Sequence, residues 1–240
     1  MEMKDLVCAV TGSGKGLGKA IAEKFFQEGA KVVLWDRSGL AKEVMASLDP
    51  SGERTLYVRA DVREEEQVMQ AAAQIAAKVG RIDVLVNNAG ISRHKPLAEM
   101  TVDLWDEVID TNLKGVFLCC KAISPYMKEQ KRGKIVNIAS LGGRTGRPGV
   151  GVNYAASKAG VVGITQLLAK ELGACGDLRQ RHSPGPDPHG ADEAIPSGCL
   201  RDLERRPGGS QGRPAGGCGG PGCFSGFPAF GLGHGYDRRY

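Results

Sequence analysis

The sequence of 240 residues predicts an α/β protein built on a doubly wound parallel sheet, and three observations support this fold class. Through about residue 173, short apolar and β-branched runs alternate regularly with helix-like stretches. A glycine-rich turn separates the first apolar run from the first helix, and the second run ends on a carboxylate. Strands that alternate with helices imply a parallel sheet covered on both faces. Right-handed crossovers then give the doubly wound arrangement, with ligands at the carboxyl ends of the strands.

The apolar periodicity places each element in order along the chain. Strands are expected where the apolar runs lie, over residues 6–10, 31–35, 54–59, 82–86 and 134–138. Helices are expected at about residues 16–28, 38–48, 64–79, 101–129 and 153–173. Glu64-Glu65-Glu66 precedes an alanine-rich run, and acidic residues favour the first turn of a helix. Thr101 is expected to cap the next helix.

The segment Thr11–Gly18 reads Thr-Gly-Ser-Gly-Lys-Gly-Leu-Gly, between an apolar run and a helix-like run. Glycines let the backbone turn tightly and approach a pyrophosphate, which then faces the N-terminal end of the helix. Asp36 ends the second apolar run, eighteen residues after Gly18, where a carboxylate is expected to bind an adenosine ribose. The sequence therefore predicts a Rossmann-like nucleotide site. The alternative is a glycine turn without a ligand.

Composition indicates one globular domain with an ordinary core, since 41% of residues are hydrophobic and 25% are charged. The net charge of +5 is spread along the chain, and the densest basic run, Lys128–Lys134, is typical of a solvated loop. We therefore expect no nucleic-acid partner. There is no apolar signal region or membrane-length apolar run, so the protein is expected to be cytoplasmic. The seven cysteines lack the paired spacing of a metal site, and none is expected.

A second group of polar residues follows the later strands. Asn87–Gly90 comes after the fourth strand, where Asn88 can hydrogen-bond near a cofactor and Ala89-Gly90 leave room for it, although a simple turn also fits. Asn112 lies inside a long helical pattern, and Ser140 ends the fifth strand. Tyr154 and Lys158 are four residues apart and share one face of a helix. The ammonium is expected to stabilise the phenolate and to lower the pKa of Tyr154.

At this point the chain resembles the short-chain dehydrogenase/reductase family over residues 1–173. Thr11–Gly18 matches the cofactor motif of the family, Asp61-Val62 its adenine contact, and Asn87–Gly90 its motif after the fourth strand. The catalytic tetrad of the family corresponds to Asn112, Ser140, Tyr154 and Lys158. The predicted cofactor contacts are Gly12, Ser13, Lys15, Gly16, Leu17, Gly18, Asp36, Arg37, Asp61, Val62, Asn88, Ala89, Gly90, Tyr154 and Lys158. Asn153–Gly160 is most similar to 3-oxoacyl-acyl-carrier-protein reductases and related small alcohol dehydrogenases.

The resemblance implies an NAD(P)-dependent oxidoreductase that interconverts an alcohol and a carbonyl, for instance by reducing a 3-oxoacyl thioester. Tyr154 is then the general acid or base, Ser140 binds the substrate oxygen, Lys158 tunes Tyr154, and Asn112 holds a water. It also implies a homo-oligomer, a tetramer, for the parent enzyme. The alternative is a non-catalytic nucleotide-binding protein of the same fold. Four basic residues in loops after strands either contact an acidic substrate or are solvated: Arg93, His94, Arg144 and Arg147.

The cofactor choice depends on three side chains. Asp36 is expected to accept both hydroxyls of an NAD ribose and to repel a 2′-phosphate. Arg37 and Lys15 favour the phosphate of NADP instead. Because the carboxylate sits where the ribose is expected, NAD is predicted, with NADP as the alternative.

The order of elements ends after Gly173, and residues 174–240 are predicted to be an irregular tail outside the domain of residues 1–173. The last 67 residues hold 16 of the 35 glycines and 8 of the 12 prolines. Synonymous codons for Asp177–Pro188, read one base later, encode Ile-Tyr-Val-Asn-Ala-Ile-Ala-Pro-Gly-Pro-Ile-Arg, a strand leading into the motif that the family has here. We therefore expect a reading-frame shift near Gly176 and missing C-terminal strands, and an inactive truncated product of the same fold is the alternative to an active enzyme. The alternative is a genuine, disordered interaction segment.

Overall fold

The structure is a computed structural model that describes residues 3–145, 149–173 and 177–185. All of these lie in one compact unit, Met1–Pro207. Its parallel sheet has the order β3-β2-β1-β4-β5-β6. The strands are β1 Val7–Thr11, β2 Lys31–Asp36, β3 Thr55–Arg59, β4 Val84–Asn87, β5 Arg132–Ser140 and β6 Asp177–Gly185. The main helices are α1 Gly16–Gln27, α2 Leu40–Leu48, α3 Glu65–Val79, α4 Val102–Ile109, α5 Gly115–Glu129, α6 Gly142–Thr145 and α7 Val152–Gly173.

The strand order confirms the doubly wound prediction. From β1 the chain moves outward to β2 and β3, and then returns to place β4 on the other side of β1. Val10 pairs in register with Leu34 on one side and with Val86 on the other. The order therefore reverses between β1 and β4, and a ligand is expected at the carboxyl ends of these two strands.

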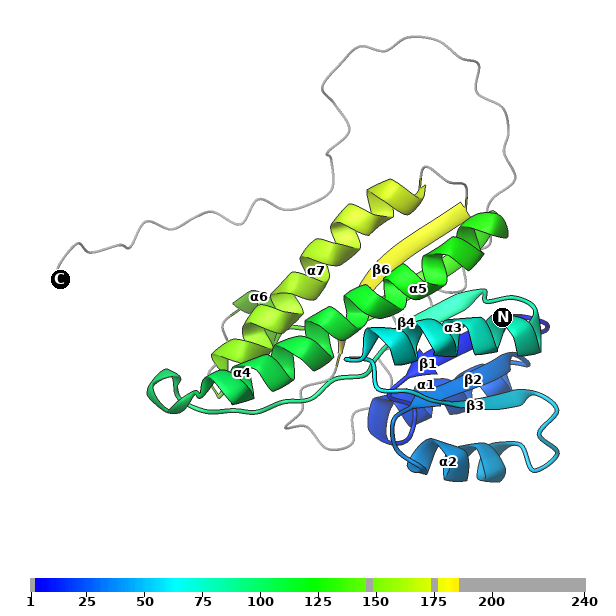
Figure 1. Ribbon diagram of the computed structural model, residues 1–240, viewed down its shortest axis with the longest axis horizontal. Helices are drawn as coiled ribbons and strands as arrows, with labels where there is room; N and C mark the ends of the chain where they lie inside the picture. The colour runs from blue at the N-terminus through cyan, green and yellow to red at the C-terminus, as the bar shows by residue number, and fades with distance from the viewer. Residues whose placement is uncertain (1–2, 146–148, 174–176, 186–240) are drawn as a thin grey trace, which may run out of the picture. The chain divides into compact units, whose positions relative to one another are not determined.

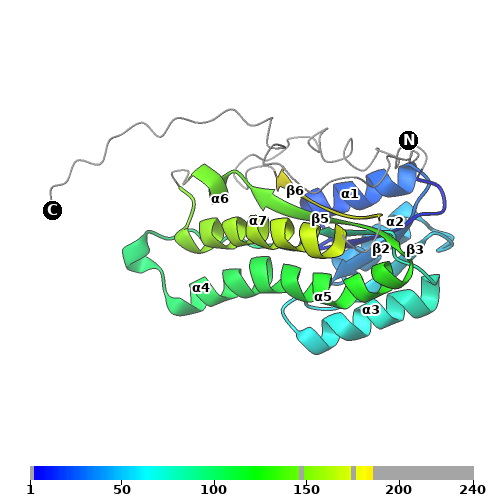
Figure 2. The ribbon, with the colours of Figure 1, turned by 90° about the horizontal axis from the view of Figure 1, so that it is seen from above.

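The sheet separates two apolar clusters, as a sheet covered on both faces requires. Along β1, Val7 and Ala9 belong to one cluster, whereas Cys8 and Val10 belong to the other. Side chains of α3, α5 and α7 complete the first cluster, and those of α1 and α2 complete the second. The two groups of helices lie on opposite sides of the strands (Figures 1 and 2). The alternation along one strand thus fixes which face each helix covers.

Most helix boundaries agree with the sequence prediction. The Thr101 hydroxyl caps α4 by accepting a hydrogen bond from the Leu104 N–H at 3.2 Å, as expected. The helix predicted over residues 101–129 is helical throughout Val102–Glu129, but a π-helical turn that was not predicted, Asp110–Lys114, divides it into α4 and α5. A short 3₁₀ turn, Leu97–Glu99, and the helix α6 were not predicted. Within the described residues, no helix is long and apolar enough to cross a membrane.

The strand β6 corrects the prediction that the sixth strand is missing. Asp177–Gly185 pairs in parallel with the whole of β5, from Arg132 to Ser140. It is an edge strand among the described strands, which is where a residue such as Pro184 is tolerated. Its polar sequence lacks the apolar run that marks a buried parallel strand, so the sequence pattern did not reveal it. The seventh strand and the tail beyond Gly185 lie outside the described residues.

Candidate cofactor and catalytic site

The turn between β1 and α1 has a backbone conformation that favours glycine. Gly12 and Gly16 have φ angles of +67° and +55°, in the left-handed region. A side chain at Gly18 would overlap the carbonyl oxygen of Gly12 and the amide of Asn88. Lys15 precedes α1 and offers its first N–H groups no side-chain hydrogen bond. The turn therefore leaves a positive helix end open to a phosphate.

Thr11 and Asn88 fasten the ends of β1 and β4 together beside this turn. The Thr11 hydroxyl accepts hydrogen bonds from the backbone N–H groups of Asn88 and Ala89, both at 3.1 Å. The Asn88 side-chain amide donates to the carbonyl oxygens of Thr11 and Gly12, also at 3.1 Å. Asn88 thus holds the glycine turn in shape. The sequence identified Asn88 as a cofactor residue but not this contact with the turn.

Asp36 lies at the end of β2, as predicted, and faces the turn. One carboxylate oxygen accepts the Gly14 N–H at 3.0 Å. The other accepts the N–H and the hydroxyl of Ser38, both at 2.8 Å. These bonds fix the carboxylate in place. Its position beside the glycine turn is the one expected for a group that binds an adenosine ribose.

A cavity of about 450 Å³ opens at the carboxyl ends of β1, β2 and β4. Eleven of the predicted cofactor residues line it: Gly12, Lys15, Gly16, Leu17, Asp36, Arg37, Asp61, Val62, Asn88, Ala89 and Gly90. Ser13, a further predicted contact, is fully buried. The sequence analysis missed six lining residues, namely Trp35, Ser38, Leu40, Ala60, Ile91 and Thr111. All six directly neighbour, or lie close to, predicted site residues in the sequence, so proximity to a predicted motif is the signal that would have found them.

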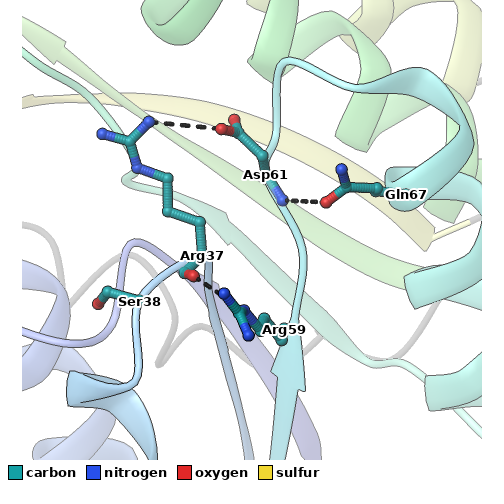
Figure 3. Close-up of a pocket in the computed structure, with 5 residues that line it drawn as sticks. All are labelled: Arg37, Ser38, Arg59, Asp61 and Gln67. Carbon is teal, nitrogen blue, oxygen red and sulfur yellow. Dashed lines mark hydrogen bonds and ion pairs between the residues drawn. The ribbon is translucent and has the colours of Figure 1, made fainter.

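Asp61 stands where this cavity meets a smaller pocket lined by Arg37, Ser38, Arg59 and Gln67 (Figure 3). Its carboxylate receives a hydrogen bond from Arg63 at 2.7 Å and a longer one from Arg37 at 3.4 Å. Burial disfavours the charged carboxylate, but the hydrogen bonds from Arg63 outweigh that effect and lower the pKa of Asp61. Asp61 is therefore an ionised acceptor at the adenine end expected from the sequence.

Ser140, Tyr154 and Lys158 are all buried, and come from β5 and α7. The Lys158 ammonium donates to the Ile138 carbonyl at 2.6 Å and lies 5.8 Å from the centre of the Tyr154 ring. Burial lowers the pKa of Lys158 to about 8. The ammonium therefore remains mostly protonated at pH 7 and places a positive charge beside the phenol. The lowered pKa of Tyr154 stays a prediction.

Asn112 lies in the π-helical turn and is fully buried. Its side chain accepts the Ile91 N–H at 2.8 Å and donates to the Ile91 carbonyl at 2.9 Å. It also donates to the Ser157 hydroxyl at 3.2 Å. The predicted tetrad residue thus joins the connection after β4 to the helix α7. Its role in holding a water stays a prediction.

The four basic loop residues have different surroundings. Arg93 forms a two-pronged ion pair with Glu107, at 3.0 and 2.9 Å, so its guanidinium is already paired. His94 lies against Tyr154, with ring centres 6.1 Å apart. Arg144 is exposed on α6, and Arg147 lies outside the described residues. Of the four, His94 is the one that the described contacts bring to Tyr154.

Comparison with known proteins gives the family. A family model described as short chain dehydrogenase matches residues 6–177. The chain is 44% identical over 181 residues to a 3-oxoacyl-[acyl-carrier-protein] reductase of Synechocystis sp., covering 75% of this chain and 73% of the relative. It is 40% identical over 220 residues to the reductase of the same name from Thermotoga maritima, covering 89% and 87%.

A solved structure gives the same assignment. The fold matches a protein from Sinorhizobium meliloti assigned as a short-chain alcohol dehydrogenase, with a TM-score of 0.69 and 35% identity. That match covers 72% of this chain and 69% of the other. Together with the glycine turn and the buried Ser140, Tyr154 and Lys158, these matches show that the chain belongs to the short-chain dehydrogenase family of oxidoreductases.

Proposed function

We propose that the chain interconverts an alcohol and a carbonyl with NAD(H), and that Tyr154 is its general acid and base. The observation that carries the proposal is the burial of all three polar side chains, Ser140, Tyr154 and Lys158, at the end of β5 and on α7. It is supported by the Lys158 ammonium, which lies 5.8 Å from the centre of the Tyr154 ring and bonds to the carbonyl oxygen of Ile138, two residues before Ser140. A hydroxyl, a phenol and an ammonium supply the hydrogen-bond donor, the proton and the charge that carbonyl reduction needs.

The residues around the cavity fit a dinucleotide. A side chain on Gly18 would collide with the Gly12 carbonyl and the Asn88 amide and would distort the turn, and the carboxylate of Asp36 stands beside the turn. The turn would hold the pyrophosphate, Asp36 the adenosine ribose, and Asp61 the adenine. When bound, the nicotinamide supplies or accepts the hydride.

The chain itself supplies the proton. In reduction, the Tyr154 hydroxyl gives its proton to the carbonyl oxygen, and in oxidation the phenolate takes it back. The neighbouring Lys158 ammonium stabilises the phenolate that remains. The Ser140 hydroxyl donates a hydrogen bond to the same oxygen, where negative charge develops. Buried surroundings strengthen each of these interactions.

The substrate that we propose is a 3-oxoacyl thioester, because two relatives at 44% and 40% identity are named 3-oxoacyl-[acyl-carrier-protein] reductases. The alternative, a non-catalytic nucleotide-binding protein, accounts for the cavity but not for the complete set of Ser140, Tyr154 and Lys158. Oxidation of NADH with acetoacetyl-CoA as a probe substrate distinguishes the two. Binding of NADH without turnover of this probe or of a simple ketone would favour the alternative.

The preference for NAD over NADP rests on the fixed carboxylate of Asp36. A 2′-phosphate on the ribose would bring a second negative charge to this carboxylate. The Arg37 guanidinium, which would favour that phosphate, is paired with Asp61 at 3.4 Å. Both observations support NAD.

Titrations of the full chain with NADH and NADPH, followed by nicotinamide fluorescence, test this preference. We expect tighter binding of NADH, and we expect Asp36→Asn to narrow the difference by about tenfold, since one charge is removed at similar shape. Asp106→Asn, which removes an exposed carboxylate on α4, is the matched control and should change neither affinity. A wild-type chain that binds NADPH more tightly would contradict the assignment.

A further inference from the structure

His94 lies in the connection between β4 and α4, and its imidazole faces the catalytic tyrosine. The two rings are arranged edge to face, with centres 6.1 Å apart and planes at 66°. The contact itself is weak. What distinguishes His94 is the hydrogen bonding of its two nitrogens, which joins parts of the chain that are distant in sequence.

Both ring nitrogens have defined roles. The backbone N–H of Gly151 donates to Nδ1 at 2.9 Å. A nitrogen that accepts carries no proton, so the neutral ring has its proton on Nε2. Nε2 lies 2.5 Å from the Ser92 hydroxyl oxygen and donates to it. The imidazole therefore bonds to its own loop through Nε2 and to the segment before α7 through Nδ1.

Gly151 controls the start of α7. Its carbonyl oxygen accepts the N–H of Ala155 at 3.0 Å, which is the first hydrogen bond of the helix. Tyr154 lies within that first turn. A side chain at Gly151 would come within 3.0 Å of the Arg93 carbonyl oxygen, so a glycine is what allows the two segments to approach. Holding Gly151 therefore holds the turn that carries the tyrosine.

Two neighbouring contacts attach the segments on either side of the His94–Gly151 hydrogen bond to the helix α4. The Asn153 side chain donates to the Leu104 carbonyl at 3.0 Å and attaches α7 to α4. The ion pair of Arg93 with Glu107 attaches the loop of His94 to the same helix. The start of α7 and the loop that carries His94 are thus each attached to α4. The hydrogen bond from Gly151 to the imidazole joins these two segments directly, next to the Tyr154 ring.

We propose that His94 is a positioning residue: its Nδ1 acceptor fixes Gly151 and the first turn of α7, so that the Tyr154 hydroxyl is directed at the reacting oxygen. The proposal rests on the function proposed above. A general acid must lie within hydrogen-bond reach of the atom it protonates, and a displacement of about 1 Å can lower the rate about a hundredfold. The role differs from binding an acidic substrate, because both nitrogens bond within the protein.

Three variants of the full chain separate the Nδ1 acceptor from the bulk of the ring. His94→Asn places an amide oxygen near the position of Nδ1 and keeps the acceptor. His94→Gln reaches the position of Nε2 and lacks that acceptor, and His94→Leu fills the space without polar atoms. If the link to Gly151 matters, Asn will resemble the wild type, whereas Gln and Leu will resemble each other.

The first measurement is hydrogen exchange followed by mass spectrometry, which needs neither cofactor nor substrate. Peptides covering residues 149–157 should exchange about tenfold faster in the Gln and Leu variants than in the wild type or the Asn variant. Peptides from β1 and β2 should exchange equally in all four proteins. Equal exchange of residues 149–157 in all four proteins would overturn the proposal.

The second measurement is the oxidation of NADH with acetoacetyl-CoA. We expect kcat to fall about 10- to 100-fold in the Gln and Leu variants, with the Kd of NADH unchanged within twofold and with Asn restoring most of kcat. Altered exchange with unchanged kcat would overturn the positioning role, as would kcat values that follow the melting temperature instead of the acceptor. If exchange follows the acceptor but the wild type itself lacks turnover, the link to Gly151 stands and the proposed function fails.

Discussion

The two halves of the site are constructed in different ways. The cofactor half is made mainly of backbone, because Gly12, Gly16 and Gly18 shape a turn that is complete within eight residues of sequence. The catalytic half is made of side chains from distant elements, among them Asn112 and Lys158, and each of these is buried. A turn shaped by backbone can be specified by a short stretch of glycine-rich sequence. A buried set of polar side chains requires long-range contacts that keep each group paired.

The difference also has an energetic side. In the cofactor half, the charge of Asp36 is stabilised by neighbouring backbone, through the hydrogen bonds from the N–H groups of Gly14 and Ser38. In the catalytic half, an ammonium is withdrawn from water at Lys158, which disfavours its charged form. We therefore expect added side-chain bulk to disrupt cofactor binding in the cofactor half. In the catalytic half, we expect the contribution to stability to depend on pH.

The largest effect is expected at Gly18, because a methyl group there meets backbone that cannot move aside. Gly18→Ala should weaken NADH binding at least a hundredfold and destabilise the fold by about 1–3 kcal/mol or more. Gly39→Ala is the matched control, since within the described part of the chain no atom would lie within 4 Å of its methyl group. Fluorescence titration and thermal unfolding measure both effects. Normal binding by the Gly18 variant would refute the close fit of the turn.

A smaller effect, and one specific to the catalytic half, is expected from Lys158. Burial lowers its pKa from the ordinary value of 10.5, which applies to the unfolded chain, to about 8 in the folded protein. Between these values the unfolded chain binds more protons, so the contribution of Lys158 to stability is lowest below pH 8 and rises as pH increases through it. The free energy of unfolding of the wild type relative to Lys158→Met should rise by on the order of 1 kcal/mol per pH unit from pH 8 to 10.

Urea unfolding at several pH values provides this comparison. Lys170→Met, which removes an exposed lysine from the end of the same helix, should show no such slope. A flat difference between wild type and Lys158→Met would mean that the ammonium is not desolvated as the structure indicates.

An effect on stability alone is expected at the junction of β1 and β4. Thr11→Val leaves the N–H groups of Asn88 and Ala89 without their hydroxyl acceptor, and should lower the free energy of unfolding by about 1–3 kcal/mol. Thr11→Ser retains the hydroxyl and should lie close to the wild type. Denaturant unfolding of both variants measures the effect, and a Thr11→Val variant as stable as the wild type would contradict the role of the hydroxyl acceptor.

The same contrast explains what the sequence could predict. The glycine turn, Asp36 and the pair Tyr154 and Lys158 were predictable, because each depends on local spacing. The π-helical turn around Asn112 was not, since a single extra residue in the hydrogen-bond pattern hardly alters helical periodicity. The link from His94 to Gly151 joins residues 57 positions apart and exists only in the folded chain.

The strand β6 marks a different limit. Asp177–Gly185 carries few apolar residues, and its pairing with β5 is made by the backbone, which leaves no trace in a hydrophobic pattern. The strand β6 begins at Asp177, the residue at which the alternative reading frame would also begin a strand. Resequencing codons 170–180 tests the frame-shift hypothesis, which the pairing of these nine residues does not address.

The most direct test of the proposed function compares the wild-type chain with Tyr154→Phe, which removes one oxygen atom and retains the ring. NADH binding is measured by fluorescence, and turnover by the oxidation of NADH with acetoacetyl-CoA. We expect the Kd of NADH to stay within about twofold and kcat to fall by about 10²- to 10⁴-fold, the contribution of a general acid. Turnover that is unchanged in the variant would contradict the role of Tyr154 and, with it, the chemistry proposed for this site.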